Sequence, residues 1–139
     1  MWISTLPRFV TNGIPEHCMS AFFDTNIVID LLAGHPAALA EAASHAEVAI
    51  SRMTWMEVLI GAPDEPTKAK WESFLNQFEM IEMDEDVCRE AIALRQQHRI
   101  KLPDALIWAS ARAYGSDLVT RNTRDFKVGT PGIRVPYTI

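Results

Sequence analysis

The chain has 139 residues, of which 48% are hydrophobic, and its formal net charge is −5 at neutral pH. This length fits one compact domain, and the apolar fraction is high enough to form a core without disulfides or a structural metal. The acidic balance argues against nucleic-acid binding through overall charge. A nucleic-acid substrate would therefore need a local basic surface, together with a metal ion to offset any acidic site.

The beginning of the chain differs from the rest. Residues 1–18 contain two prolines and a glycine and show no clear periodicity, so they make a poor signal peptide. We expect them to be an N-terminal extension of uncertain role that precedes a domain of residues 19–139, unless translation starts at Met19. The two cysteines, Cys18 and Cys88, have no CxxC spacing, which predicts free thiols and a cytoplasmic location. No apolar run approaches the roughly 18 residues of a membrane span.

Short apolar runs alternate with segments of helical spacing along the chain. Strands are predicted at residues 21–23, 48–51, 80–83, 118–120 and 133–135. Helices are predicted at residues 25–32, 39–46, 53–60, 71–78, 84–98 and 103–114. This alternation predicts a three-layer α/β/α fold with a central parallel sheet of four to five strands. Ligands of such sheets bind beyond the carboxyl ends of the strands, where we expect the first and fourth strands to be neighbours.

Four acidic residues lie where a predicted strand ends or a predicted helix begins: Asp24, Glu57, Asp104 and Asp125. Each has a simpler local explanation. Asp24 and Asp104 can cap helices, Glu57 can form a capping box with Thr54, and Asp125 can be a turn residue. However, Glu57 has large apolar neighbours, which predicts a half-buried carboxylate that needs a partner. Four carboxylates gathered in one place would repel each other, and a hard divalent cation is the usual reason for proteins to tolerate this.

The remaining ionisable residues receive ordinary roles. We expect seven other acidic residues to lie on solvated faces and in turns, namely Asp30, Glu47, Asp64, Glu65, Asp84, Glu85 and Asp86. The histidines show no metal-binding spacing, and surface or capping roles are expected for His17, His35, His45 and His98.

Four segments together resemble a known family. In chain order they are residues 22–26 (FFDTN), Thr54 and Glu57 followed by Gly61, residues 102–107 (LPDALI), and residues 120–126 (TRNTRDF). This order and spacing are similar to those of PIN domains and, within that superfamily, of the VapC-type toxins of type II toxin–antitoxin pairs. The resemblance covers residues 20–137.

The resemblance implies an Mg²⁺- or Mn²⁺-dependent endoribonuclease that cleaves structured RNA, of the tRNA or rRNA class, through metal-activated water and leaves 5′-phosphate and 3′-hydroxyl ends. It also implies a cognate antitoxin and a homodimer. The catalytic and metal-binding positions of the family match Asp24, Glu57, Asp104 and Asp125, and its accessory polar positions match Thr120 and Asn122. One departure is that the family's first Asp normally lies only a few residues from the N-terminus.

Basic residues close to the acidic segments are candidates for RNA contacts: Arg52, Lys101, Arg112, Arg121 and Arg124. Two other functions disagree with the sequence. A haloacid-dehalogenase-like phosphatase needs a second Asp where this chain has Asn26, and a receiver domain needs an acidic pair and a late Lys that the sequence lacks. A catalytically inert PIN-like module that binds a partner stays open as the alternative.

Overall fold

A computed structural model describes residues 20–139. Five strands form one sheet, namely β1 (Ser20–Phe23), β2 (Glu47–Ser51), β3 (Glu79–Ile81), β4 (Leu118–Val119) and β5 (Ile133–Arg134). Their order is β3-β2-β1-β4-β5, and all neighbouring pairs are parallel. The predicted parallel sheet is confirmed, as is the contact between the first and fourth strands. The N-terminal extension predicted for residues 1–18 lies outside the described residues.

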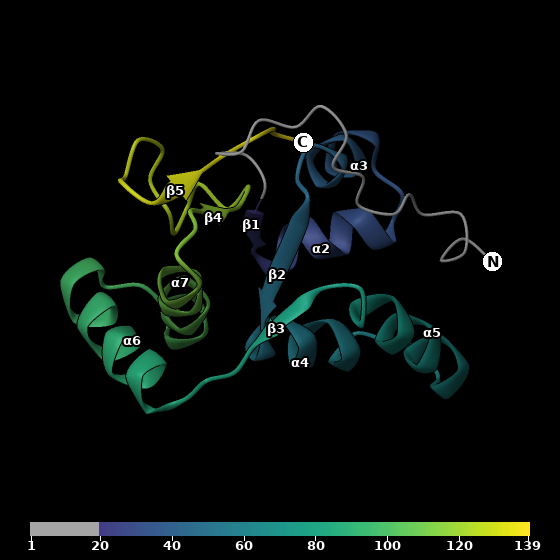
Figure 1. The fold of residues 1–139 in the computed structure, drawn as a ribbon, viewed down its shortest axis with the longest axis horizontal. Coiled ribbons are helices and arrows are strands. Elements are labelled where there is room, and N and C mark those ends of the chain that lie inside the picture. The colour runs from purple at the N-terminus through teal and green to yellow at the C-terminus, as the bar shows by residue number, and fades with distance from the viewer. Residues whose placement is uncertain (1–19) are drawn as a thin grey trace.

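Helices cover both faces of the sheet (Figure 1). Four lie on one face, namely α2 (Thr25–Leu32), α3 (Pro36–Ala43), α4 (Arg52–Ile60) and α5 (Glu65–Leu75). The other face is covered by α6 (Glu85–His98) and α7 (Leu102–Tyr114). This arrangement confirms the three-layer α/β/α fold. Within residues 20–139, no helix combines the length and the apolar character needed to cross a bilayer.

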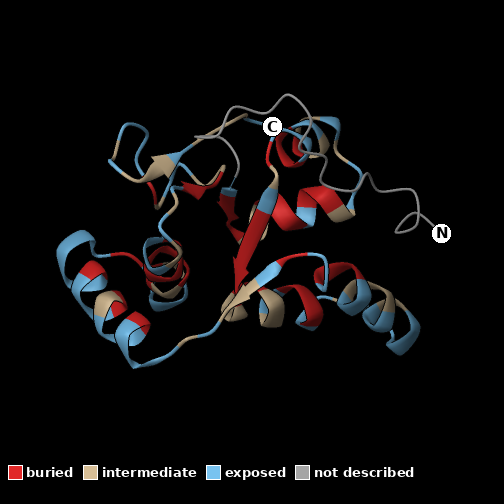
Figure 2. Cartoon of the chain, in the orientation of Figure 1, coloured by how far each residue is buried: buried red, intermediate tan, exposed pale blue. Residues whose placement is uncertain are grey.

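The alternation of side chains along each strand produces two separate cores. In β1, Phe23 packs toward α2 and its neighbours, whereas Phe22 packs toward α6 and α7. Successive side chains of a strand point to opposite faces, so a fully apolar strand is expected where both faces are covered. Figure 2 shows the consequence, because β1 and β2 beyond their first residues and the middle of α7 are buried, whereas α6 is buried along one side only.

Two helices begin earlier than predicted because the prediction rested on apolar spacing and not on the capping residue and proline that begin each helix. The helix predicted at 39–46 is α3, which His35 caps and which has Pro36 in its first turn. The helix predicted at 71–78 is α5, which Asp64 caps and which has Pro66 in its first turn. Apolar spacing marks the buried face of a helix but not its ends, which depend on caps and on proline.

Candidate active site

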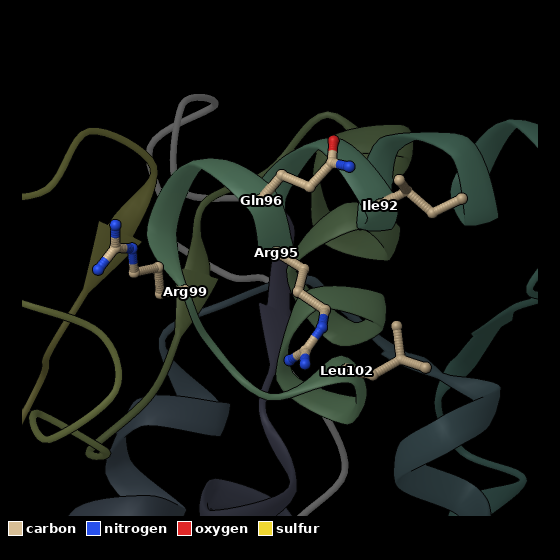
Figure 3. Close-up of a pocket in the computed structure, with 5 residues that line it drawn as sticks. All are labelled: Ile92, Arg95, Gln96, Arg99 and Leu102. Carbon is tan, nitrogen blue, oxygen red and sulfur yellow. The ribbon is translucent and has the colours of Figure 1, made fainter.

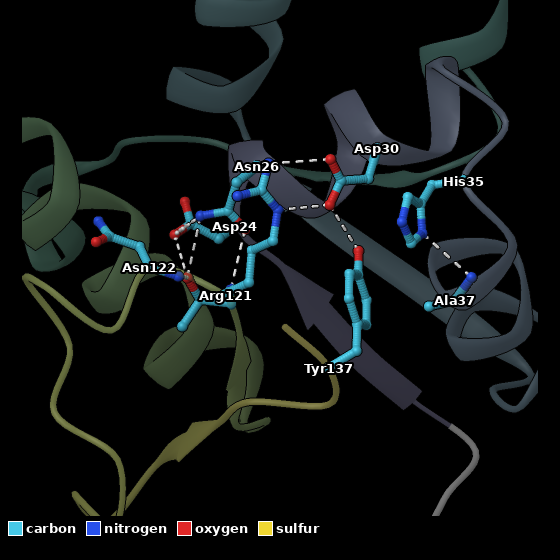
Figure 4. A network of polar contacts seen from close by, with 9 residues as sticks. Asp24, Asn26, Asp30, His35, Ala37, Arg121, Asn122 and Tyr137 are labelled. Carbon is cyan, nitrogen blue, oxygen red and sulfur yellow. Dashed lines mark hydrogen bonds and ion pairs between the residues drawn. The ribbon is translucent and has the colours of Figure 1, made fainter. Parts of the chain in front are cut away.

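Asp24 lies at the junction of β1 and α2 and is only 3% exposed. Its Oδ1 accepts a hydrogen bond of 2.7 Å from the backbone N–H of Thr25. Its Oδ2 accepts from Thr120 Oγ1 at 2.8 Å and from Asn26 Nδ2 at 3.2 Å (Figure 4). Asp24 therefore caps α2, as the simpler explanation predicted. It is also held by donors from two segments that lie far apart in the sequence.

The environment of Asp24 disfavours its charge. Burial raises its pKa to about 6, and the nearby charge of Glu57 acts in the same direction, while the hydrogen bonds from Thr120, Thr25 and Asn26 act against it. These donors are neutral, and no cationic side chain within residues 20–139 forms an ion pair with Asp24. At neutral pH the protein therefore holds a buried carboxylate whose charge is not compensated by any of these ion pairs.

Asp104 lies in the first turn of α7, a helix whose N-cap, Lys101, makes no side-chain capping bond. Burial is the main cause that raises the pKa of Asp104 to about 6, followed by the negative charges of Asp24, Asp125 and Glu57 and by a hydrogen bond with Asp125. The four acidic residues singled out in the sequence are therefore within electrostatic range of one another. Asp104 therefore carries an unfavourable negative charge at neutral pH because it is half-buried among other carboxylates.

Glu57 differs from its predicted environment in two ways. The predicted capping box is wrong, because Ser51 caps α4 and Thr54 lies inside the helix with its side chain buried. The predicted half-burial is also wrong, because Glu57 is exposed. Its Oε1 accepts a hydrogen bond of 2.7 Å from Thr25 Oγ1, which also contacts Thr54 Oγ1 at 2.9 Å. Glu57 is therefore bonded to the residue that directly follows Asp24 in the chain.

The loop after β4 contributes the last polar group. Asn122 Nδ2 donates to Asp125 Oδ2 at 2.9 Å, and the backbone N–H of Asp125 donates back to Asn122 Oδ1 at 3.2 Å. The backbone N–H of Asn122 donates to Thr120 Oγ1 at 3.0 Å. A single chain of hydrogen bonds therefore runs from Asp24 through Thr120 and Asn122 to Asp125.

Comparison with known protein families gives one match: the family model of the PIN domain matches residues 21–129. The chain belongs to the PIN domain family. A chain in a toxin–antitoxin complex from Klebsiella pneumoniae is 43% identical to this PIN domain, with a TM-score of 0.78, and the match covers 86% of this chain and 99% of that chain. A chain of VapBC2 from Rickettsia felis, solved bound to a DNA fragment from its promoter, is 26% identical with a TM-score of 0.67. The match covers 83% of this chain and 96% of that chain.

Further similarity concerns the fold alone. VapBC-1 from nontypeable Haemophilus influenzae is 24% identical with a TM-score of 0.63, and the match covers 78% of this chain and 91% of that chain. No curated protein matches the chain. The predicted resemblance to VapC-type PIN toxins is confirmed, and such toxins are generally nucleases.

The PIN domain's carboxylates do not form a finished chelate. Within residues 20–139, no group of three or more His, Cys, Asp or Glu side chains is arranged to hold a metal ion by itself. The donor set nevertheless fits Mg²⁺ or Mn²⁺, because Mg²⁺ takes oxygen ligands, keeps several waters and needs only one or two carboxylates from the protein. Asp24 is buried, Asp104 and Asp125 are half-buried, and none of the three forms an ion pair within residues 20–139, whereas Glu57 is exposed. Their roles in catalysis and metal binding stay predictions.

Two residues assigned to the surface are buried in this PIN domain. Asp30 is 6% exposed and forms an ion pair with Arg121, so its assignment to a solvated face is wrong. His45 is 8% exposed and contacts Glu41 at 2.8 Å, so its assignment to a surface or capping role is also wrong. A sequence signal existed for Asp30, since it interrupts the apolar run of residues 27–32 and an acid in such a run needs a partner.

The candidate RNA contacts fall into two groups. Three of the five are engaged in ion pairs within the PIN domain, namely Arg52 with Glu82, Arg112 with Glu90, and Arg121 with Asp30. The other two, Lys101 and Arg124, are exposed and have no ion-pair partner in the described part of the chain. An external ligand of this second pair would not compete with an internal ion pair.

Several hollows lie beside α6 and α7 in the described part of the chain, and two of them matter here. One of about 500 Å³ is lined by Ile92, Arg95, Gln96, Arg99 and Leu102, and none of the four acidic residues contributes to it (Figure 3). A smaller one of about 210 Å³ is lined by Asp125 and by polar residues that include Gln97, His98 and Lys127. Of these two hollows, the smaller one therefore adjoins the acidic cluster, through Asp125.

Proposed function

We propose that this protein is a metal-dependent endoribonuclease that acts as the toxin of a toxin–antitoxin pair and cleaves structured RNA of the tRNA or rRNA class. One observation carries the proposal. The negative charges of Asp24, Asp125 and Glu57 raise the pKa of Asp104 at the carboxyl edge of the sheet, and no cation within residues 20–139 forms an ion pair with Asp24. Clustered carboxylates with raised pKa are typical of functional sites.

The residues of the site have distinct roles in this proposal. Asp24 and Asp104 would hold the Mg²⁺ or Mn²⁺ ion, and Glu57 and Asp125 would complete its surroundings through water. A bound divalent cation supplies activation of water and stabilisation of charge on the scissile phosphate. Thr120 and Asn122 orient the carboxylates of Asp24 and Asp125 through their hydrogen bonds. No protein nucleophile is required.

The RNA backbone needs cations that the acidic chain provides only locally. Lys101 directly precedes α7 and lies three residues before Asp104, and Arg124 directly precedes Asp125. These two exposed cations therefore flank the proposed metal ligands and are suited to bind phosphates on either side of the scissile bond. The hollow of about 210 Å³ beside Asp125 offers room for a neighbouring nucleotide, with donors from Gln97, His98 and Lys127.

An antitoxin partner follows from similarity. The structures most similar to this chain include toxin–antitoxin complexes, some of them bound to DNA. Physically, an antitoxin could insert an Arg side chain between Asp24 and Asp104, because a guanidinium pairs with carboxylates in two-pronged geometry and would compete with the metal. A homodimer and a cytoplasmic location also stay predictions.

The test is cleavage of a tRNA and rRNA mixture by the purified full chain, with and without Mn²⁺. Asp104→Asn should abolish metal-stimulated cleavage, while the exposed Asp117→Asn serves as a control with the same chemical change. Full activity of Asp104→Asn would reject the assignment. Absence of both cleavage and a metal-dependent thermal shift in the unmodified protein would instead support the inert partner-binding module. Sequencing the 5′ ends of RNA fragments would identify the substrate.

A further inference from the structure

Arg121 and Asp30 form a two-pronged ion pair that ties the loop after β4 to α2. The Nε–Oδ2 distance is 2.6 Å and the Nη2–Oδ1 distance is 3.0 Å. Asp30 is buried, and the Arg121 side chain is 34% exposed. Two parallel N–H···O bonds fix both the distance and the orientation of a guanidinium, which one contact does not. The position of the Arg121 side chain relative to α2 is therefore well defined.

This ion pair lies beside the residues that hold Asp24 (Figure 4). The backbone N–H of Arg121 donates to Asn26 Oδ1 at 3.2 Å. Asn26 Nδ2 in turn lies 3.2 Å from both Asp24 Oδ2 and Thr120 Oγ1. Because Thr120 immediately precedes Arg121, the ion pair fixes the backbone that presents the Thr120 hydroxyl to Asp24.

The C-terminal segment secures the outer side of the ion pair. Tyr137 donates a hydrogen bond of 2.9 Å from its hydroxyl to Asp30 Oδ2. Its ring stacks on the ring of His35, with 5.6 Å between centroids and 12° between planes. Asp30 therefore accepts from Arg121 on one side and from Tyr137 on the other, which leaves its carboxylate little freedom to turn away.

We propose that Arg121 and Asp30 are positioning residues that set the affinity of the site for a divalent cation. They act by holding Thr120 and Asn26 against Asp24, and not by contact with the cation or with RNA. The proposal rests on the proposed function only in that Asp24 holds the cation. Partners that orient a metal ligand are known to tune metal affinity from outside the first layer of ligands.

The chain offers a matched control in a second two-pronged bridge. Arg134 of β5 binds Glu41 of α3, with an Nε–Oε2 distance of 3.2 Å and an Nη2–Oε1 distance of 3.0 Å. Glu41 is 7% exposed, close to the 6% of Asp30. Its carboxylate also binds His45 and not a residue beside Asp24. The backbone carbonyl of Arg134 accepts a hydrogen bond from the Thr120 N–H, which a side-chain substitution leaves in place. Breaking this bridge should therefore disturb packing without releasing the Thr120 hydroxyl from Asp24.

The experiment is a Mn²⁺ titration of the full chain, followed by the electron paramagnetic resonance signal of free Mn²⁺. Arg121→Lys should raise the Kd for Mn²⁺ about tenfold, whereas Arg134→Lys should leave it at the unmodified value although both lower the melting temperature. Cleavage by Arg121→Lys should recover at saturating Mn²⁺. An unchanged Kd in Arg121→Lys, or the same increase in Arg134→Lys, would overturn the proposal.

A milder pair of variants covers the case in which Arg121→Lys does not fold. Asp30→Asn keeps the shape of the side chain and removes its charge, with Glu41→Gln as its control, and the same contrast in Kd is expected. The two proposals fail differently. Mn²⁺ binding without RNA cleavage in the unmodified protein would reject the nuclease and leave the positioning role to be decided by the variants. Absence of Mn²⁺ binding would reject the positioning role.

Discussion

Replacing Asp24 by Asn should stabilise the metal-free protein at neutral pH. The pKa of Asp24 is about 6 in the folded protein, against an ordinary value of 3.8. At about 1.4 kcal/mol per pH unit, this difference corresponds to about 3 kcal/mol of unfolding free energy. An Asn side chain cannot accept from all the donors around Asp24, which costs about 1 kcal/mol. The expected net gain is about 2 kcal/mol, or a rise of about 5 °C in melting temperature.

The gain should depend on pH in a defined direction. A carboxyl group whose folded pKa lies above its unfolded pKa binds its proton more tightly in the folded state. The stability that Asp24 contributes is therefore complete below pH 3.8 and is lost as the pH rises through about 6. Asp24→Asn should raise the melting temperature at pH 7.5 in EDTA and should bring no gain near pH 4.

Glu41 supplies a control, because its pKa is shifted in the direction opposite to that of Asp24. Burial alone would raise its pKa, but the hydrogen bonds from His45 and Arg134 lower it to about 2. Glu41→Gln should therefore lower the melting temperature at pH 7.5, and its effect should shrink as the pH falls toward 2. Thermal unfolding by circular dichroism measures both variants. Equal destabilisation by Asp24→Asn at pH 7.5 and pH 4 would refute the reasoning.

Three further outcomes are expected. Thr120→Val keeps the shape of a buried side chain but removes a donor to Asp24, so Mn²⁺ affinity should fall about tenfold, measured by titration. Gly115→Ala should cost about 1 kcal/mol, measured by denaturant unfolding, because Gly115 has a φ of 86° while its added Cβ would meet nothing within 4 Å. Phe22→Ala should cost about 3–5 kcal/mol in the same assay, since its ring is fully buried under α7. Losses below about 1 kcal/mol for Phe22→Ala would contradict the described packing.

The sequence was sufficient to predict the sheet and the helices because burial imposes a period on each. The run from Thr25 to Leu32 shows the spacing of a helix, and α2 has these bounds. Asp24 and Asp125 could be singled out because polar residues beyond the ends of parallel strands meet at one edge, and Asp104 because it begins an almost wholly apolar helix. Periodicity describes a residue's face, however, and carries no information about its tertiary partner. This is why the exposure of Glu57 and its bond to Thr25 could not be predicted.

The same limit explains the error at Asp30 and shows how the buried acids can be told apart. Asp24, Asp30 and Glu41 are all less than a tenth exposed. Arg121 compensates Asp30, and Arg134 compensates Glu41, so these two charges are satisfied within the fold. Asp24 is surrounded by neutral donors, which hold its carboxylate in place without neutralising it. A buried charge that is oriented but not compensated favours binding of a cation from solution. The three acids are similarly buried, so their partners distinguish them. Asp24, with neutral donors, is the candidate metal ligand, whereas Asp30 and Glu41, each paired with an arginine, stabilise the fold.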